Sequence, residues 1–309
     1  MKTSNYLRLF ALLLALSLSV NSFAWNHAGH MATGAIAYRF LKQYSPSTII
    51  KFVKILKAHP QFAARWQAKY DSLPDMQKDL FLFMAAARWP DDVKGTSYDH
   101  PDWHYYAFPV TFLPADTQPP KQDNSIVQFA NNLNIVKSQS ANQGAKAVAL
   151  CWVFHIMGDL HQPLNDVQLF SSAFPVGDRE ANDFLIKDPA KDLHTYWDNV
   201  FLSDAKVSYK SATWFSAVDD AAKSAKTKNG GVVFTSTTLI DTKAIANEAI
   251  ALAKASAYKF KGKLLKPGVK GGSAAVALPA GYSVEAGRVA SKQLTLAGMR
   301  LAVALFQNL

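Results

Sequence analysis

Two histidine–aspartate pairs stand out because their spacing would let each pair hold a metal ion. His155 and Asp159 interrupt the apolar run AVALCWVFHIMGD, and His194 and Asp198 occur in DLHTYWDN. A separation of four positions puts both side chains of a pair on one face of a helix. A carboxylate in an apolar helix is costly unless a partner compensates it. One such pair could be explained by a bound metal ion or by a histidine and an aspartate that hydrogen-bond each other in a helical core. The occurrence of two pairs favours the metal ion.

Further candidate ligands lie outside these two segments. RWPDDVK and HPDWHYYAF contribute Asp91, His100 and His104, and WNHAGH contributes His30. Nitrogen and carboxylate ligands without thiolates suit zinc, and carboxylates that bridge clustered ions suit hydrolysis at a multinuclear site. Residue type alone leaves iron and manganese open.

The N-terminus predicts export. Residues 1–24 have the features of a secretory signal, with Lys2 and Arg8 before the apolar run LFALLLALSLSV and small residues in SFA. The run is short for a bilayer span, and a retained signal anchor is the alternative. Cleavage after Ala24 would make Trp25 the first residue, and its α-amino group and carbonyl oxygen could together chelate a metal. We therefore predict a periplasmic or secreted protein whose processing completes a metal site.

The periodicity of apolar residues predicts an all-α protein. Helices are expected at 27–43, 46–58, 60–70, 77–87, 125–140, 144–161, 189–205, 210–226, 240–262 and 282–307. Long loops are expected at 88–124, 162–188, 227–238 and 263–281, and GGVVFTSTT in the third could form a short strand. Without an internal repeat or a clear boundary, the prediction is a single helical domain over 25–309 with a metal cleft and long functional loops.

Composition adds weaker constraints. The formal net charge is +10, and removal of Lys2 and Arg8 with the signal would leave +8, which suits an anionic substrate but is also common in exported proteins. The single cysteine, Cys151, excludes an intramolecular disulfide and is expected in the core. Since no second long apolar run follows the signal, we predict a soluble mature chain without a transmembrane segment. The segment 282–307 is interpreted as a docking helix with one apolar face.

Six motifs in order resemble the S1/P1 nucleases, zinc-dependent single-strand nucleases of the superfamily that also includes the zinc phospholipases C. They are WNHAGH, ARWPDDVK, DWHYYAF, HIMGDLHQPL, DLHTYWDN and QLTLAGMRLA. Each motif is weak alone, but the ordered combination is specific and extends from Trp25 to the last predicted helix. The resemblance implies an all-helical fold with three zinc ions in a cleft.

The resemblance also implies the ligands of these ions. One zinc would be bound by Asp91, His104, His155 and Asp159. A second would be bound by Trp25, through its amino nitrogen and carbonyl oxygen, by His30 and by a bridging Asp159. A third would be bound by His194 and Asp198.

The third zinc site departs from the family pattern. The family completes it with a histidine at the end of an HQPLH-like segment, where this chain has Asn165. An amide oxygen is a neutral and weaker zinc ligand than imidazole. His161 lies in the same segment, but two positions beyond Asp159 it points about 200° away around a helix. We expect His161 not to replace the missing ligand.

Positions implied to contact the substrate differ as well. Ala107 stands where the family often has an acidic residue near the attacking water, and DREAN (178–182) replaces an Asp-x-Gly-Gly-Asn loop. The lost glycines add side chains where the backbone could approach the substrate closely. Lys94 stands where the nucleases often have a phosphate-binding arginine, which keeps the charge but loses the bidentate geometry.

The implied function is hydrolysis of phosphoester bonds in single-stranded DNA or RNA, and in 3′-nucleotides, to 5′-phosphate products. Water activated by the ion pair that Asp159 bridges would attack phosphorus, while Lys94 and Asn199 help to hold the phosphate. Tyr105 has the family's base-stacking position, with core packing as its alternative, and Asn182 would also contact the substrate. Base stacking favours unpaired strands because paired bases are already stacked.

Two other functions stay open at this point. The same metals could attack a phospholipid head-group ester, as in a phospholipase C. Alternatively, the departures at Asn165 and Ala107 could leave an exported protein that binds zinc or nucleic acid with weakened catalysis. The sequence does not define the oligomeric state.

Overall fold

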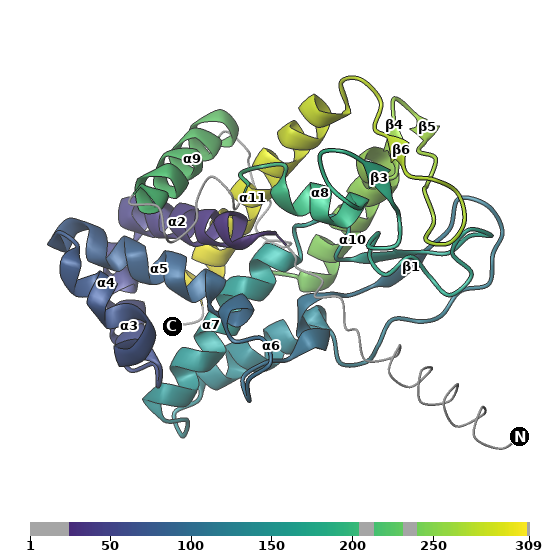
Figure 1. Cartoon of the computed structure of the whole chain (residues 1–309). Coiled ribbons are helices and arrows are strands. Elements are labelled where there is room, and N and C mark those ends of the chain that lie inside the picture. Colours follow the sequence, from purple (N-terminus) through teal and green to yellow (C-terminus); the bar gives the residue numbers. More distant parts are fainter. Residues whose placement is uncertain (1–24, 204–212, 231–239, 308–309) are drawn as a thin grey trace, which may run out of the picture.

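The computed structural model describes residues 25–203, 213–230 and 240–307. The predicted signal, 1–24, and most of the predicted strand segment GGVVFTSTT lie outside the described residues. Helices dominate the rest, and the all-α prediction is confirmed (Figure 1). The helices are α2 (His27–Tyr44), α3 (Pro46–Lys57), η1 (Phe62–Trp66), α4 (Gln67–Ser72), α5 (Asp75–Asp92), η2 (Pro101–His104), α6 (Ser125–Lys137), α7 (Gln143–Asp159), α8 (Leu193–Asn199), α9 (Trp214–Asn229), α10 (Thr242–Leu252), η4 (Ala253–Ala257) and α11 (Tyr282–Gln307).

Side-chain caps define where several helices begin. Asn26 accepts a hydrogen bond from the Gly29 amide at the start of α2, and Asn124 and Asn142 cap α6 and α7 in the same way. Such caps satisfy backbone N–H groups that have no partner within the helix. The starts of these helices are thereby fixed by single polar residues.

Close helix packing around α2 forms the main core. A Cβ atom on Gly34 of α2 would lie 2.3 Å from the Phe83 carbonyl oxygen of α5, and one on Gly298 of α11 would lie 2.5 Å from the Ile36 Cβ atom of α2. Both glycines therefore permit backbone approaches that a side chain would prevent. α7 packs against α5 and α6 and completes the same apolar cluster.

The last helix is part of this core. α11 is long and apolar enough to cross a membrane by length and composition alone, but 78% of its most apolar window is buried inside the protein. A buried core helix meets the same criterion, so the interpretation of 282–307 as a docking helix is confirmed. Cys151 is also fully buried in the core, as expected.

Two helix boundaries differ from the prediction in ways that affect the site. The sequence predicts a helix that ends at 87, but α5 continues through Pro90 to Asp92. Burial of Trp89 and Pro90 in the core offsets the backbone hydrogen bond that proline removes. Asp91 therefore lies on a helix and not in a loop.

The helix predicted at 189–205 is much shorter. α8 covers Leu193–Asn199 and begins only after Asp192, whose side chain accepts a hydrogen bond from the Thr195 amide at 2.6 Å. The preceding residues form an extended segment that ends in a cis peptide bond between Asp188 and Pro189. The predicted helix 240–262 also ends early, as α10 followed by the short η4.

Short strands join the long loops. β1 (Phe108–Val110) pairs in parallel with β2 (Val167–Leu169), with Phe108 opposite Val167. β3 (Ile186–Lys187) pairs in parallel with β6 (Val276–Ala277), and β4 (Lys259–Phe260) pairs antiparallel with β5 (Lys263–Leu264). The β1–β2 pair holds the loop after η2 beside the turn after α7, which is where the site lies.

Candidate metal centre and adjoining pocket

Three helices and one turn bring five predicted ligands together. His30 comes from α2, Asp91 from the last turn of α5, His155 and Asp159 from α7, and His104 from the end of η2. None is more than 6% exposed. We call these five residues the Asp159 cluster.

The two oxygens of Asp159 face different histidines. Oδ1 lies 3.3 Å from His30 Nε2, whereas Oδ2 lies 3.3 Å from both His104 Nδ1 and His155 Nε2. His155 and Asp159 form one donor group with His30, and His155 forms another with Asp91 and His104, each within 4.8 Å. This arrangement fits a carboxylate that bridges two cations.

Neighbouring groups orient the imidazoles. His155 Nδ1 donates to the Ala87 carbonyl oxygen at 2.8 Å, which turns Nε2 toward Asp159. The His30 ring stacks on the His155 ring at a centroid distance of 3.8 Å. Gly158 makes this approach possible, since a Cβ atom there would lie 2.9 Å from His30 Nδ1. The sequence reasoning missed Ala87 and Gly158, because neither carries a side chain that could signal a role.

Burial sets the charge state of the cluster. Burial lowers the pKa of His30 and His104 well below 6.5, and it lowers the pKa of His155 to about 4. Burial, and then the charge of Asp91, raises the pKa of Asp159. Burial therefore keeps the imidazoles neutral, and it makes ionisation of the Asp159 carboxyl costly unless a cation is bound.

A cation resolves this otherwise unfavourable arrangement. Both nitrogens of His30 and both oxygens of Asp159 lack a hydrogen-bond partner among the described residues, although all are buried. Unpaired buried polar atoms are costly, and unpaired buried carboxylates are more so. Imidazole nitrogens with carboxylate oxygens are a typical donor set for zinc. The Asp159 cluster therefore fits a metal site of the kind the family implies.

The second predicted pair is less complete. His194 Nε2 lies 3.3 Å from Asp198 Oδ2, and His194 Nδ1 donates to the Glu180 carbonyl oxygen at 2.6 Å. Gln162 Nε2 donates to Asp198 Oδ1 at 2.9 Å. We call His194 and Asp198 the His194 pair. Among the described histidine, cysteine, aspartate and glutamate residues, no third donor joins this pair within 4.8 Å.

Neither Asn165 nor His161 adds a charged or imidazole donor to the His194 pair. Asn165 is buried, and its Nδ2 lies 3.5 Å from the His104 carbonyl oxygen. The His161 ring is held between the Met157 carbonyl oxygen, 2.7 Å from Nδ1, and Arg300 Nη1, 2.8 Å from Nε2. His161 lies two residues beyond the end of α7, and these contacts turn its ring away from the cluster.

The first described residues lie close to the His194 pair. The Asn26 amide donates to the Asp198 carbonyl oxygen at 3.3 Å, and Trp25 is fully buried. Asn199, predicted to hold phosphate, accepts from Asn26 Nδ2 at 2.9 Å and donates to the Thr195 carbonyl oxygen at 2.8 Å. Its amide links Asn26 to α8, so its contact with phosphate stays a prediction, as does the chelating role of Trp25.

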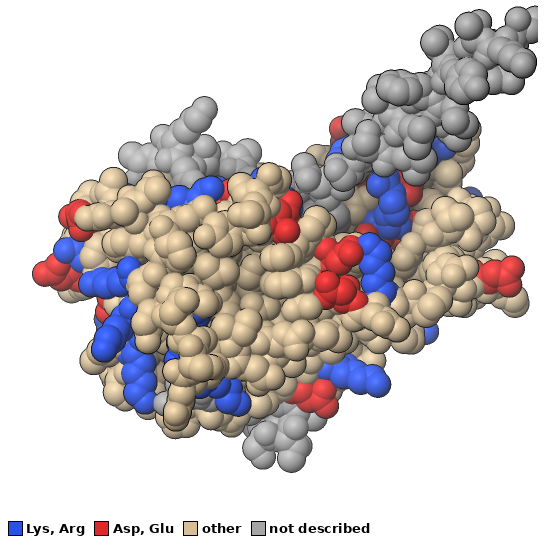
Figure 2. Space-filling view, turned by 90° about the horizontal axis from the view of Figure 1, so that it is seen from below, with Lys and Arg blue, Asp and Glu red and all other residues tan. Residues whose placement is uncertain are grey.

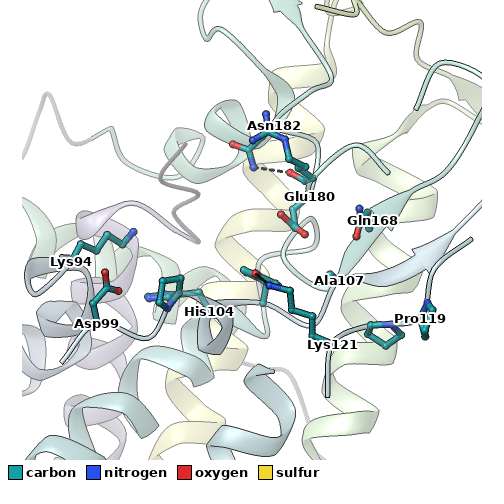
Figure 3. Close-up of a pocket in the computed structure, with 13 residues that line it drawn as sticks. Lys94, Asp99, His104, Ala107, Pro119, Lys121, Gln168, Glu180 and Asn182 are labelled. Atoms are coloured by element: carbon teal, nitrogen blue, oxygen red, sulfur yellow. Dashed lines mark hydrogen bonds between the residues drawn. The ribbon is translucent and has the colours of Figure 1, made fainter. Parts of the chain in front are cut away.

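A pocket of about 410 Å³ adjoins the Asp159 cluster and contains the predicted substrate-binding residues (Figure 3). Lys94 lines it with its Nζ 3.0 Å from Asp91 Oδ1, and Tyr105 donates to Asp102 Oδ1 at 2.5 Å. Asn182 lines the opposite wall, where its Nδ2 donates to the Arg179 carbonyl oxygen at 2.7 Å. Lys94, Tyr105 and Asn182 thus line one cavity, and their contact with a substrate stays a prediction.

Not every candidate reaches the site. The His100 ring stacks on the Trp103 ring at 3.8 Å and belongs to none of the donor groups among the described residues. The prediction of His100 as a candidate ligand therefore has no support in the structure. A histidine beside a tryptophan that can cover its face is more easily explained as packing.

The chain matches one family of known proteins. A family model described as S1/P1 Nuclease matches residues 25–309. No curated protein matches the chain. The match spans all six motifs, the Asp159 cluster, the His194 pair and the pocket. The chain therefore belongs to the S1/P1 nuclease family, whose members are metal-dependent nucleases.

Proposed function

We propose that this protein is an exported zinc-dependent phosphodiesterase that cleaves single-stranded DNA and RNA to 5′-phosphate products and also hydrolyses 3′-nucleotides. The main support is the buried Asp159 cluster, whose oxygens and nitrogens without hydrogen-bond partners adjoin a pocket that the cationic Lys94 lines. The Asp159 cluster and the pocket are adjacent, so a phosphate in the pocket could contact ions held by the cluster.

The residues of the Asp159 cluster would hold two zinc ions, and the His194 pair would hold a third with help from Asn165. Bound zinc would activate water and stabilise the charge on the phosphate and on the leaving oxygen. Lys94, whose amine lines the pocket beside Asp91, would bind a nonbridging phosphate oxygen. Asp159, whose two oxygens face different histidines, would contribute its charge to holding both ions.

The pocket favours nucleotides over acyl chains. Charged side chains surround it, since Lys94, Asp99, Lys121, Arg179 and Glu180 all contribute to its walls. Tyr105 offers a ring on which an unpaired base could stack, whereas a base within a duplex could not enter the cavity without being unpaired. This argues for single strands and against a phospholipase.

Overall charge supports the proposal less than the site does. On the face seen in Figure 2, basic side chains lie mostly toward one end with acidic side chains among them, and large uncharged areas separate them from a second group of mixed charge. Such a surface does not mark one nucleic-acid path. Export is supported by the features of residues 1–24 and by the start of the family match at residue 25.

The proposal can be tested with four substrates in parallel. Mature protein beginning at Trp25 would be loaded with zinc and assayed on single-stranded DNA, RNA, 3′-AMP and phosphatidylcholine vesicles, with zinc content measured on the same sample. We expect cleavage of the first three with 5′-phosphate ends on the oligonucleotide products. Cleavage of the vesicles alone would favour the phospholipase, and zinc-loaded protein without any activity would favour a binding protein.

A further inference from the structure

Glu180 places a buried carboxyl group inside the pocket. Its side chain points into the cavity from the wall that also carries Asn182, toward the side where His104 and Lys121 lie (Figure 3). Glu180 is only 8% exposed. No hydrogen bond or ion pair to its carboxylate occurs among the described residues, so these two acceptor oxygens are directed at whatever enters the pocket.

The loop holds Glu180 there in spite of an unfavourable backbone. Arg179, Glu180 and Ala181 have φ values of +51°, +55° and +69°. This left-handed region is unfavourable for residues other than glycine. The loop therefore keeps a backbone suited to glycine while it carries a carboxylate at Glu180.

Anchors at both ends maintain the loop. Asp178 accepts hydrogen bonds from the Leu169 amide at 2.9 Å and from the Tyr258 hydroxyl at 2.6 Å. On the other side, the Glu180 carbonyl oxygen accepts from His194 Nδ1 at 2.6 Å. Unfavourable backbone conformations that the surrounding structure holds in place are common at functional sites.

The same pocket offers Glu180 no partner at Ala107, which lines it with an apolar side chain. Glu180 belongs to neither donor group of the Asp159 cluster, so a metal ion does not account for it.

We propose that Glu180 is a specificity-determining residue that contacts the nucleobase and favours guanine, an inference that rests on the proposed nuclease function. Guanine alone among the common bases presents two adjacent donors, N1–H and the 2-amino group, to the two oxygens of a carboxylate. Thymine and uracil would instead present carbonyl oxygens on both sides of a single donor. Burial raises the pKa of Glu180 to about 8, whereas two hydrogen-bond donors of a bound guanine would favour the ionised form.

Single-base substrates test this proposal. Seven-nucleotide strands of thymidine with one central guanosine, adenosine, cytidine or thymidine would be cleaved by zinc-loaded wild-type protein and by Glu180→Gln, with cut sites mapped. We expect kcat/KM for the bonds beside guanosine to exceed the others at least about fivefold. In Glu180→Gln the preference should fall below about twofold, because an amide replaces one acceptor with a donor.

A second variant separates this role from a folding defect. Glu180→Gly should lose the guanosine preference but raise Tm, since glycine tolerates positive φ. Glu285→Gln removes an exposed glutamate from α11 and should keep the preference. Equal cleavage of all four strands by wild type, or a preference that survives both Glu180 substitutions, would overturn the inference and leave the proposed function intact. Absence of cleavage of every strand would overturn both.

Discussion

The Asp159 cluster and the His194 pair contain the same sequence pattern, but they differ in the number of donors that the fold adds to it. Each starts with a histidine and an aspartate four residues apart on a helix. The helix of the first packs against α2 and α5, which carry His30 and Asp91. The helix of the second is two turns long and faces Gln162 and the loop that carries Glu180.

This difference shows what a metal site needs beyond its starting pair. Long helices that pack closely bring further donors to fixed positions, and the glycines at 34, 158 and 298 make the contacts close enough. The His194 pair receives amide and carbonyl groups, which orient its side chains but add no charge. The cluster should therefore bind metal more tightly than the pair.

Substitution of Asp159 should have the largest effect. Asp159→Asn keeps the size but removes the bridging charge, so we expect a loss of both cluster ions and at least about a 100-fold fall in phosphodiesterase activity. Without metal, the variant should be more stable than wild type by about 1–3 kcal/mol, because an unpaired buried carboxylate is removed. Zinc analysis and denaturation with EDTA would measure these effects. A wild type that is not destabilised by EDTA would contradict the role of the cluster as a metal site.

Restoring an imidazole should strengthen the weaker site. Asn165→His is expected to raise the zinc content that survives dialysis by about one ion per chain, since imidazole binds zinc better than an amide. Mass spectrometry of the intact protein would count the ions. Asn131→His, which adds an imidazole at an exposed position of α6, serves as the control. Equal zinc content in wild type and Asn165→His would mean that Asn165 does not face the His194 pair.

A residue added before Trp25 in the mature protein should weaken the binding of one ion, the one that Trp25, His30 and Asp159 are predicted to hold. A protein that begins at Trp25 is compared with one that carries an additional glycine before it. We expect the extended form to bind that ion about 10- to 100-fold more weakly, because the α-amino group becomes an amide. Competition with a zinc chelator measures the affinity. Equal affinities would exclude a ligand role for the Trp25 amino group.

A buried histidine outside both sites should have no effect on metal content. His59 accepts a hydrogen bond from the Gln61 amide at 3.1 Å and contacts the rings of Trp66 and Trp89. Burial lowers its pKa to about 4, so the folded chain resists a proton that the unfolded chain accepts below 6.5. Stability should therefore fall as pH drops from 6.5 to 4, with a contribution from His59 of at most about 3 kcal/mol.

The variant His59→Leu should keep the zinc content of wild type. The slope of its free energy of unfolding against pH should be smaller, by the amount that corresponds to about one proton. Urea denaturation at several pH values gives the slope. Loss of zinc in His59→Leu would show that buried histidines affect metal through general stability, which would weaken the contrast between the two sites.

Much of the fold and the site could be predicted from residue patterns. Apolar periodicity predicts α2, α3, α6, α7, α9 and α11 to within a few residues, because each buries one face along its length. The four-residue spacing predicts that His155 and Asp159 share a face, and they do. Ordered motifs predict the family, which the match over 25–309 confirms.

Other features depended on contacts that no local pattern contains. The extension of α5 through Pro90 depends on core packing, and α8 starts late because β3 precedes it and Asp192 caps it. The role of Gly158 appears only where α7 meets His30. Glu180 stands out in the sequence only as a lost glycine, whereas the structure shows its carboxylate inside the pocket.

The sequence by itself thus determined which residues could bind metal and that His155 and Asp159 share one face of a helix, because ligand chemistry and helical spacing are local properties. Tertiary structure decided which of them meet. Packing of α2, α5 and η2 against α7 brings His30, Asp91 and His104 to Asp159. Among the described residues, no third histidine, cysteine or carboxylate donor joins the His194 pair on the short α8 within 4.8 Å. Donor number depends on the distances between elements far apart in the chain, and only the packed core sets those distances.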